Sequence, residues 1–169
     1  MTAYKANFTK TSLIVPESRV VADLLLREVT HEEWKHEIFD KNVLQKRTRE
    51  TALTYASIAR SRLETMGPGL WELVRDGTLP VATHAMLAAT VKFSPLLGDF
   101  MHNILQDQYR QFKSHLDSSL WSQYIENCRN QDVEMSEWSD STCSKLRQNA
   151  MRILACIPSE HMGPKWSKY

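Results

Sequence analysis

The chain has 169 residues, of which 42% are hydrophobic and 24% charged, and its formal net charge is +1. Its five glycines and six prolines are too few for a collagen-like or generally disordered chain, and its length suits one compact domain or two small ones. The near-neutral balance argues against a general polyanion-binding chain, so a nucleic-acid site has to come from local clusters of charge.

Cysteine usage and hydropathy predict the compartment. Cys128, Cys143 and Cys156 are odd in number and form no C-x-x-C pair, so we expect neither a zinc site nor a disulfide framework. The first 18 residues lack the long apolar core of a signal peptide, and no window approaches the about 18 to 20 apolar residues of a membrane span. These features predict a soluble protein of the reducing cytoplasm. No heptad run indicates a coiled coil, so we expect a monomer.

Helical spacing of apolar residues recurs from Ser18 onward, and the alternation typical of strands is scarce. An all-α fold is therefore predicted, compact and globular and built from many helices. Residues 1–12 are polar apart from Tyr4 and Phe8, and we expect them to form an arm that packs on the body through these two rings.

A capping-box pattern follows the first helix. The Thr30 side chain can accept an amide hydrogen bond while Glu33 reaches back to the backbone, which predicts a second helix over residues 31–40 that buries Trp34. Asn42 is well suited to the left-handed turn that ends this helix.

A third helix is predicted from near Gln45 or Lys46 to about Met66. It starts in a window, residues 41–49, that contains several basic residues and no acidic one. A helix, a short break and a second helix that opens on cations is the geometry of a helix-turn-helix element, with an ordinary αα-hairpin as the alternative. The predicted DNA-binding residues of this element are Gln45, Lys46, Arg47, Thr48 and Arg49.

The clearest break in the chain is Gly67-Pro68-Gly69. We therefore expect an N-terminal helical subdomain, 1–66, with the first helix-turn-helix, and a C-terminal helical subdomain, 67–169, the two packed as one globular unit. The nearly apolar helix over residues 80–93 is expected to be buried at the centre of the molecule, where His84 would be a core histidine.

The last strong helical pattern covers residues 139–157. It pairs with the helix over 118–129, across an acidic connector, as a second helix-turn-helix-like element. One face is apolar, and the other carries side-chain types that pair with phosphates and base edges, beside hydroxyl residues at the helix start. The predicted DNA-binding residues are Ser141, Thr142, Lys145, Gln148, Asn149 and Arg152. The tail after Pro158 shows no periodicity.

Several short motifs occur in an order that resembles a known family. They are Phe8-Thr9-Lys10 with Leu13, Glu17-Ser18, Trp34, Asn42 within N-V-L-Q, Arg47-Thr48, Arg62-Leu63, and S-x-S-T-x-x-K-L-R-Q from Ser139 to Gln148. Together they look like BrxA, the small helical protein of the bacteriophage exclusion (BREX) defence systems of bacteria. The resemblance runs through most of residues 4–157, and this chain departs from it in its short C-terminal tail.

The resemblance implies an all-α fold with helix-turn-helix elements, double-stranded DNA binding, and service in phage defence beside a methyltransferase and ATPases. It implies no catalytic activity of its own, and no cofactor is predicted. The residues agree: the sequence has no H-E-x-x-H motif, Gly-rich phosphate loop or nucleophile elbow, so no catalytic or metal-binding residue is predicted. The alternative to a DNA-binding protein is an adaptor that docks its basic helices on acidic surfaces of partner subunits.

Overall fold

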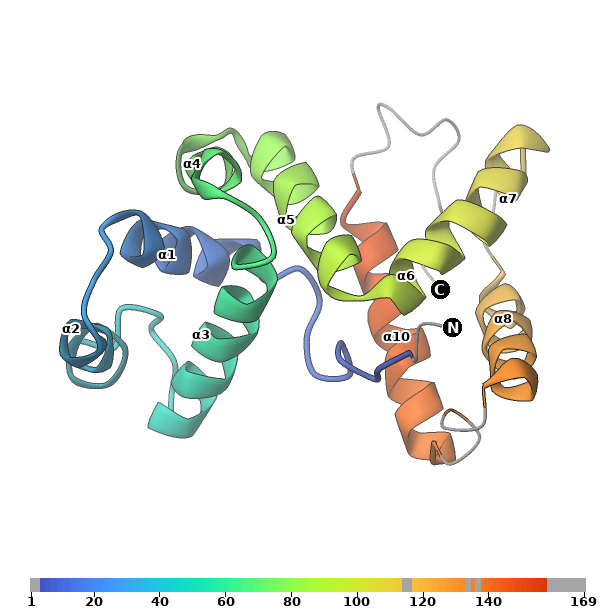
Figure 1. The fold of residues 1–169 in the computed structure, drawn as a ribbon, viewed down its shortest axis with the longest axis horizontal. Coiled ribbons are helices and arrows are strands. Elements are labelled where there is room, and N and C mark those ends of the chain that lie inside the picture. Colours follow the sequence, from blue (N-terminus) through green and yellow to red (C-terminus); the bar gives the residue numbers. More distant parts are fainter. Residues whose placement is uncertain (1–3, 114–116, 133–134, 136–137, 158–169) are drawn as a thin grey trace. The chain divides into compact units, whose positions relative to one another are not determined.

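A computed structural model describes residues 4–113, 117–132, 135 and 138–157 of the chain. Every regular element in these ranges is helical, and none is a strand, which confirms the predicted all-α class (Figure 1). The elements are α1 (Val15–Leu26), α2 (His31–Lys35), η1 (His36–Asp40), α3 (Arg49–Leu63), α4 (Pro68–Asp76), α5 (Leu79–Phe93), α6 (Pro95–Phe100), η2 (Met101–Leu105), α7 (Gln106–Arg110), α8 (Ser118–Gln131) and α10 (Asp140–Ala155). The segments η1 and η2 have π-helical hydrogen bonding and continue α2 and α6.

The helices group into two compact units. The central unit is Leu13–Phe93, and the terminal unit combines Met1–Ser12 with Ser94–Tyr169. The predicted boundary between subdomains, after Met66, falls inside the central unit. It does so because α4 packs against α1, and α5 packs against α3 and α4. The tail after Pro158 lies outside the described residues.

Small side chains bring the helices of the central unit close together. Ala52, Ala56 and Ala59 are buried along one face of α3, so neighbouring helices can approach its backbone. Gly77 ends α4 where a Cβ atom would lie 2.4 Å from the Leu73 carbonyl oxygen, so only glycine fits without a shift of the backbone.

An arginine from another helix closes the end of α4. The two terminal nitrogens of the Arg19 guanidinium donate hydrogen bonds to the carbonyl oxygens of Arg75 and Gly77, each at 2.7 Å. These carbonyls have no partner within the helix, so a cation from α1 both satisfies them and lies at the negative end of the helix dipole.

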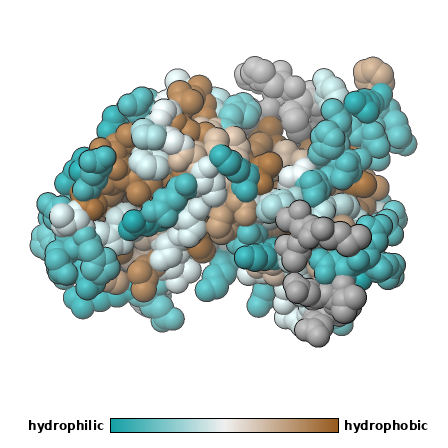
Figure 2. Space-filling view, in the orientation of Figure 1, coloured by the Kyte–Doolittle hydropathy of each residue, from teal (hydrophilic) through white to brown (hydrophobic). Residues whose placement is uncertain are grey.

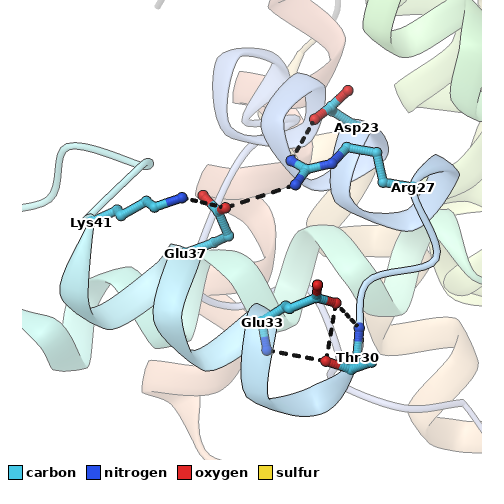
Figure 3. Close-up of polar contacts among 6 residues, drawn as sticks. All are labelled: Asp23, Arg27, Thr30, Glu33, Glu37 and Lys41. Atoms are coloured by element: carbon cyan, nitrogen blue, oxygen red, sulfur yellow. Dashed lines mark hydrogen bonds and ion pairs between the residues drawn. The ribbon is translucent and has the colours of Figure 1, made fainter.

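The predicted capping box at the start of α2 is present (Figure 3). The Glu33 amide donates to the Thr30 hydroxyl at 3.3 Å, and the Thr30 amide donates to the Glu33 carboxylate at 2.7 Å. The carboxylate also accepts a hydrogen bond from the Thr30 hydroxyl at 3.0 Å, and the two hydrogen bonds from the Thr30 amide and hydroxyl hold the pKa of Glu33 below its usual value. One turn later, the Glu37 carboxylate accepts a hydrogen bond from Lys41, and this bond lowers the pKa of Glu37. The same carboxylate lies 3.8 Å from the Arg27 guanidinium (Figure 3).

An aromatic cluster forms the core of the terminal unit. Phe8, Phe100, Trp121 and Tyr124 contact one another with ring centroids 4.7 to 6.0 Å apart. The Tyr4 hydroxyl donates to the Asp99 carboxylate at 2.6 Å. The prediction that the N-terminal arm packs through Tyr4 and Phe8 is therefore confirmed: the Tyr4 hydroxyl contacts α6, and the Phe8 ring contacts α8.

The central unit contains a buried charge, and its helix α5 is less buried than predicted. Arg62 is fully buried, and burial lowers the pKa of its guanidinium to about 10, so it remains charged at neutral pH. The predicted full burial of the apolar helix α5 is not observed: it is buried on one face only, and Leu79 and Val81 at its start are 65% and 40% exposed. Hydrophobic and hydrophilic surface is accordingly interspersed over this unit in Figure 2.

Candidate nucleic-acid interface

Residues 42–48, here called the basic turn, lie before α3 and not within it. The predicted helix start at Gln45 or Lys46 is wrong: Thr48 is the N-cap residue, and Arg49 is the first residue of α3. Asn42 and Gln45 have φ angles of 47° and 51°, and these left-handed residues are incompatible with helix, so the chain enters α3 only after them. The left-handed conformation of Asn42 itself was predicted and is confirmed.

The three cations near the helix start differ in their availability. Arg47 and Arg49 are exposed, and neither guanidinium pairs with any acid in the described part of the chain. Lys46 has only 21% of its side chain exposed, forms an ion pair with Glu17, and lies 4.3 Å from the centroid of the Tyr55 ring. The guanidiniums of Arg47 and Arg49 are therefore available to a ligand, whereas the Lys46 ammonium group is already engaged within the protein.

The two uncharged candidates of the basic turn also differ. Thr48 uses its hydroxyl as the helix cap: it accepts from the Thr51 amide at 3.1 Å and donates to the Thr51 hydroxyl at 2.8 Å. A side chain engaged in this way has little capacity left for a base edge. Gln45 is exposed and uses only its backbone amide, which donates to the Asn42 carbonyl at 2.7 Å.

The structure adds a cation that sequence reasoning missed. Lys35, on the preceding helix, and Arg49 line one surface hollow of about 610 Å³. Sequence spacing gave no sign of this, because the two residues belong to different helices. The hollow also contains Glu32 and Asp40, so its charge is mixed. One of these two carboxylates has a partner on its own helix, since the Asp40 carboxylate lies 3.0 Å from the His36 ring nitrogen.

The second candidate surface is the polar face of α10, formed by Ser141, Lys145, Gln148 and Arg152. At 100° per residue these four residues fall within a sector of about 60°, and all four are exposed. No acidic residue occurs between 141 and 157. The helix begins at an N-cap serine: the Ser139 hydroxyl accepts from the Thr142 amide at 3.2 Å. The Thr142 hydroxyl lies 3.0 Å from that of Ser139, so it belongs to the cap.

Asn149 does not belong to the polar face. It is 3% exposed, and its side-chain amide donates to the Phe8 carbonyl at 3.0 Å. The expectation that Asn149 lies on the polar side of α10 is wrong, because the N-terminal arm covers that edge of the helix. Its amide oxygen accepts a long hydrogen bond, 3.4 Å, from Arg152, which remains exposed.

A groove runs between α8 and α10. It has a volume of about 570 Å³ and is lined by aromatic, charged and small polar side chains, among them Trp121, Arg129, Asp140 and Arg147. The connector between the two helices covers residues 132–139, and the one before α3 covers 41–48. Both are longer than the roughly three- to four-residue turn of a helix-turn-helix, so that detail of the fold stays a prediction.

Among the described residues there is neither a candidate membrane span nor a cluster of metal-binding side chains. No helix in residues 4–113 or in the described part of 117–157 is both long and apolar enough to cross a bilayer. Within the same ranges, no group of three or more His, Cys, Asp and Glu side chains is placed to hold a metal ion.

The fold and these surfaces define a class: an all-helical protein that presents exposed cations beside the start of one helix and along the polar face of another. A model of the BrxA family matches residues 2–156. The BREX protein BrxA of Paramagnetospirillum magneticum is 50% identical over 151 residues, covering 89% of this chain and 76% of that protein. The BREX protein BrxA of Escherichia coli O9:H4 is 31% identical over 143 residues, covering 85% of this chain and 67% of that protein.

A solved structure agrees with these matches. The crystal structure of an uncharacterized protein from Magnetospirillum magneticum superimposes with a TM-score of 0.80 at 46% identity, covering 92% of this chain and 81% of that one. The chain therefore belongs to the BrxA family and is a component of a BREX phage-defence system.

Proposed function

We propose that this protein is a non-enzymatic subunit of its BREX system that binds double-stranded DNA in the bacterial cytoplasm. The observation that carries the proposal is the polar face of α10. It combines two exposed cations, Lys145 and Arg152, with Gln148 and Ser141 on one side of a helix, in a stretch without acidic residues. Cations neutralise phosphates, and a glutamine can pair with adenine in the major groove, which is wide enough to admit a helix.

The surface beside the start of α3 supports the same proposal more weakly. Arg47 and Arg49 are exposed and free of acidic partners among the described residues, as phosphate-binding guanidiniums need to be. Acidic neighbours are close, however: Glu50 lies in the first turn of α3, and Glu32 lines the hollow with Arg49. This surface is therefore suited to a few local phosphate contacts.

The test is the affinity for unrelated duplexes, measured by fluorescence anisotropy over a range of salt concentrations. If a handful of cations contact phosphates, log K falls linearly with log salt, with a slope of about −0.9 for each contact. Lys145→Ala with Arg152→Ala is expected to weaken binding and flatten this slope. Arg110→Ala with Lys113→Ala is the matched control, because it removes two exposed cations from the same unit but away from α10.

Two results would contradict the proposal. One is a wild-type protein that does not bind duplex DNA even at low salt. The other is an α10 variant whose affinity and salt slope equal those of the Arg110/Lys113 control. Either result favours the alternative, an adaptor subunit that contacts other BREX subunits, such as the methyltransferase or the ATPases, without contacting DNA itself.

A further inference from the structure

Lys46 has the residue type of a phosphate ligand but the surroundings of a structural residue. Its ammonium group forms an ion pair with Glu17, in the first turn of α1, and lies 4.3 Å from the centre of the Tyr55 ring on α3. The exposed fractions of the Lys46 and Glu17 side chains are 21% and 14%. An ion pair this poorly exposed, completed by a cation–π contact, restrains a side chain more than a surface ion pair does.

The backbone of the basic turn is restrained as well. The Asn42 side chain accepts a hydrogen bond from the Lys46 amide at 3.0 Å and donates one to the Lys46 carbonyl at 2.8 Å. The Gln45 amide donates to the Asn42 carbonyl at 2.7 Å, and Leu44 is 94% buried, its exposed fraction being 6%. Side-chain and backbone contacts therefore converge on the residue that directly precedes Arg47.

We propose that Glu17, Asn42 and Lys46 are positioning residues, which hold the basic turn in one conformation so that Arg47 and Arg49 are already placed to meet DNA phosphates. Lys46 itself makes no contact with DNA. This inference rests on the proposed DNA binding, and it adds how the surface beside the start of α3 is held ready for DNA. A turn fixed before binding does not have to be ordered on binding, and this reduces the entropic cost of each contact.

The sign of one charge change distinguishes this proposal from simple electrostatics. Glu17→Gln removes a negative charge close to the basic turn, so electrostatics alone predicts tighter DNA binding. Loss of the Glu17–Lys46 ion pair predicts the opposite, a weakening of about two- to tenfold, the cost of ordering one side chain on binding. Glu64→Gln is the matched control, because Glu64 also pairs with a basic side chain, Arg60, but is exposed at the far end of α3.

A set of variants makes the test quantitative. Glu17→Gln, Lys46→Met and the double variant all remove the same ion pair, so the proposal predicts that all three weaken binding to a similar extent. It also predicts that Lys46→Met leaves the salt slope unchanged, whereas Arg47→Met reduces its magnitude by about 0.9. If the single charge changes instead have opposite effects that cancel in the double variant, or if Lys46→Met flattens the slope as Arg47→Met does, the proposal is wrong.

A measurement without DNA separates this inference from the proposed function. The Lys46 amide is hydrogen-bonded to Asn42, so its hydrogen exchange reports the order of the turn. Exchange is expected to accelerate in Glu17→Gln and in Asn42→Gly, which keeps the left-handed φ but removes both side-chain bonds. If the exchange rate is unchanged in both variants, the proposal that these residues restrain the turn is wrong. If exchange accelerates but the wild-type protein binds no duplex, the restraint is real and the proposed function, with the DNA role of the turn, is what fails.

Discussion

The basic turn before α3 and the polar face of α10 contain the same kinds of side chain, yet they present them differently. In the basic turn, Lys46 is paired with Glu17 and the Thr48 hydroxyl caps the helix, so the cations that remain available are Arg47 and, at the first position of α3, Arg49. On α10, every residue of the polar face is exposed along several turns of helix. The comparison shows that the number of basic residues in a stretch of sequence overestimates what a ligand can reach.

The largest effect on DNA binding is expected on α10. If the proposed function holds, replacing Lys145, Gln148 and Arg152 together by alanine removes two phosphate contacts and one base contact, which predicts a loss of about 10- to 100-fold in affinity at moderate salt. The salt slope should flatten by about 1.8, or about 0.9 for each cation removed. Titration by fluorescence anisotropy at several salt concentrations measures both. A loss no larger than that caused by changes in the basic turn would reverse the ranking of the two surfaces.

Asn149 and Gln148 are neighbours in sequence but should differ in which property they control. Asn149→Ala leaves the buried Phe8 carbonyl without its donor, which costs about 1–3 kcal/mol of folding free energy. The Gln148 side chain is exposed, so Gln148→Ala should leave the folding free energy within about 0.5 kcal/mol of the wild-type value. Urea denaturation measures both values. Equal stabilities for the two variants would place Asn149 on the polar face after all.

Changing the two guanidiniums beside the start of α3 should have a smaller effect than changing α10. Arg47→Ala with Arg49→Ala is expected to weaken DNA binding by about three- to tenfold, because nearby carboxylates already offset part of the charge. The loss should be equal for duplexes of unrelated sequence, since phosphate contacts do not distinguish bases. A loss that depends on the duplex sequence would show that this surface contacts base edges.

The two helix caps provide a comparison that does not depend on DNA. Thr48→Ala and Ser139→Ala each remove an N-cap hydroxyl, so each should cost about 1 kcal/mol of stability. Thr48→Ser keeps the cap and should behave as the wild type. The same variants test the predicted base contact: if Thr48→Ser retains stability but loses affinity for particular duplexes, the Thr48 side chain contacts DNA as well as capping α3.

The smallest effect is a difference in the pH response of the two units. In the central unit, hydrogen bonds lower the pKa of Glu33 and Glu37, so their contribution to stability is present above about pH 5 and is lost as the pH falls through their lowered pKa values. In the terminal unit, burial raises the pKa of Tyr4 and Cys128, so stability there falls as the pH rises above the unfolded values of about 10 and 9.

Urea titrations followed by resolved amide signals from each unit can measure this difference. The central unit is expected to lose stability on going from pH 7 to pH 4, and Glu33→Gln with Glu37→Gln should reduce that loss. The terminal unit should lose stability on going from pH 7 to pH 10. If acid destabilises both units equally, or if the glutamine variants respond to acid as the wild type does, these carboxylates are not the origin of the response.

Local chemistry explains which predictions from the sequence were confirmed. The capping box at Thr30 and Glu33 and the left-handed Asn42 depend on residues only a few positions apart, so the sequence contains all the information they require. The predicted start of α3 is too early because the helical pattern does not reveal the left-handed conformation of Gln45. The burial of Arg62, by contrast, is a tertiary effect that charge patterning cannot reveal.

By itself, the sequence determined the helical class, most of the helix positions, the exposed cations of α10 and the resemblance to the BrxA family, because periodicity, caps and motif order are all local. Only the tertiary structure decided which polar side chains remain available. The fold pairs Lys46 with Glu17, 29 residues away, covers Asn149 with the N-terminal arm, and places Lys35 beside Arg49 in one hollow. The physical reason is that availability depends on neighbours from other helices, and these neighbours are set by packing.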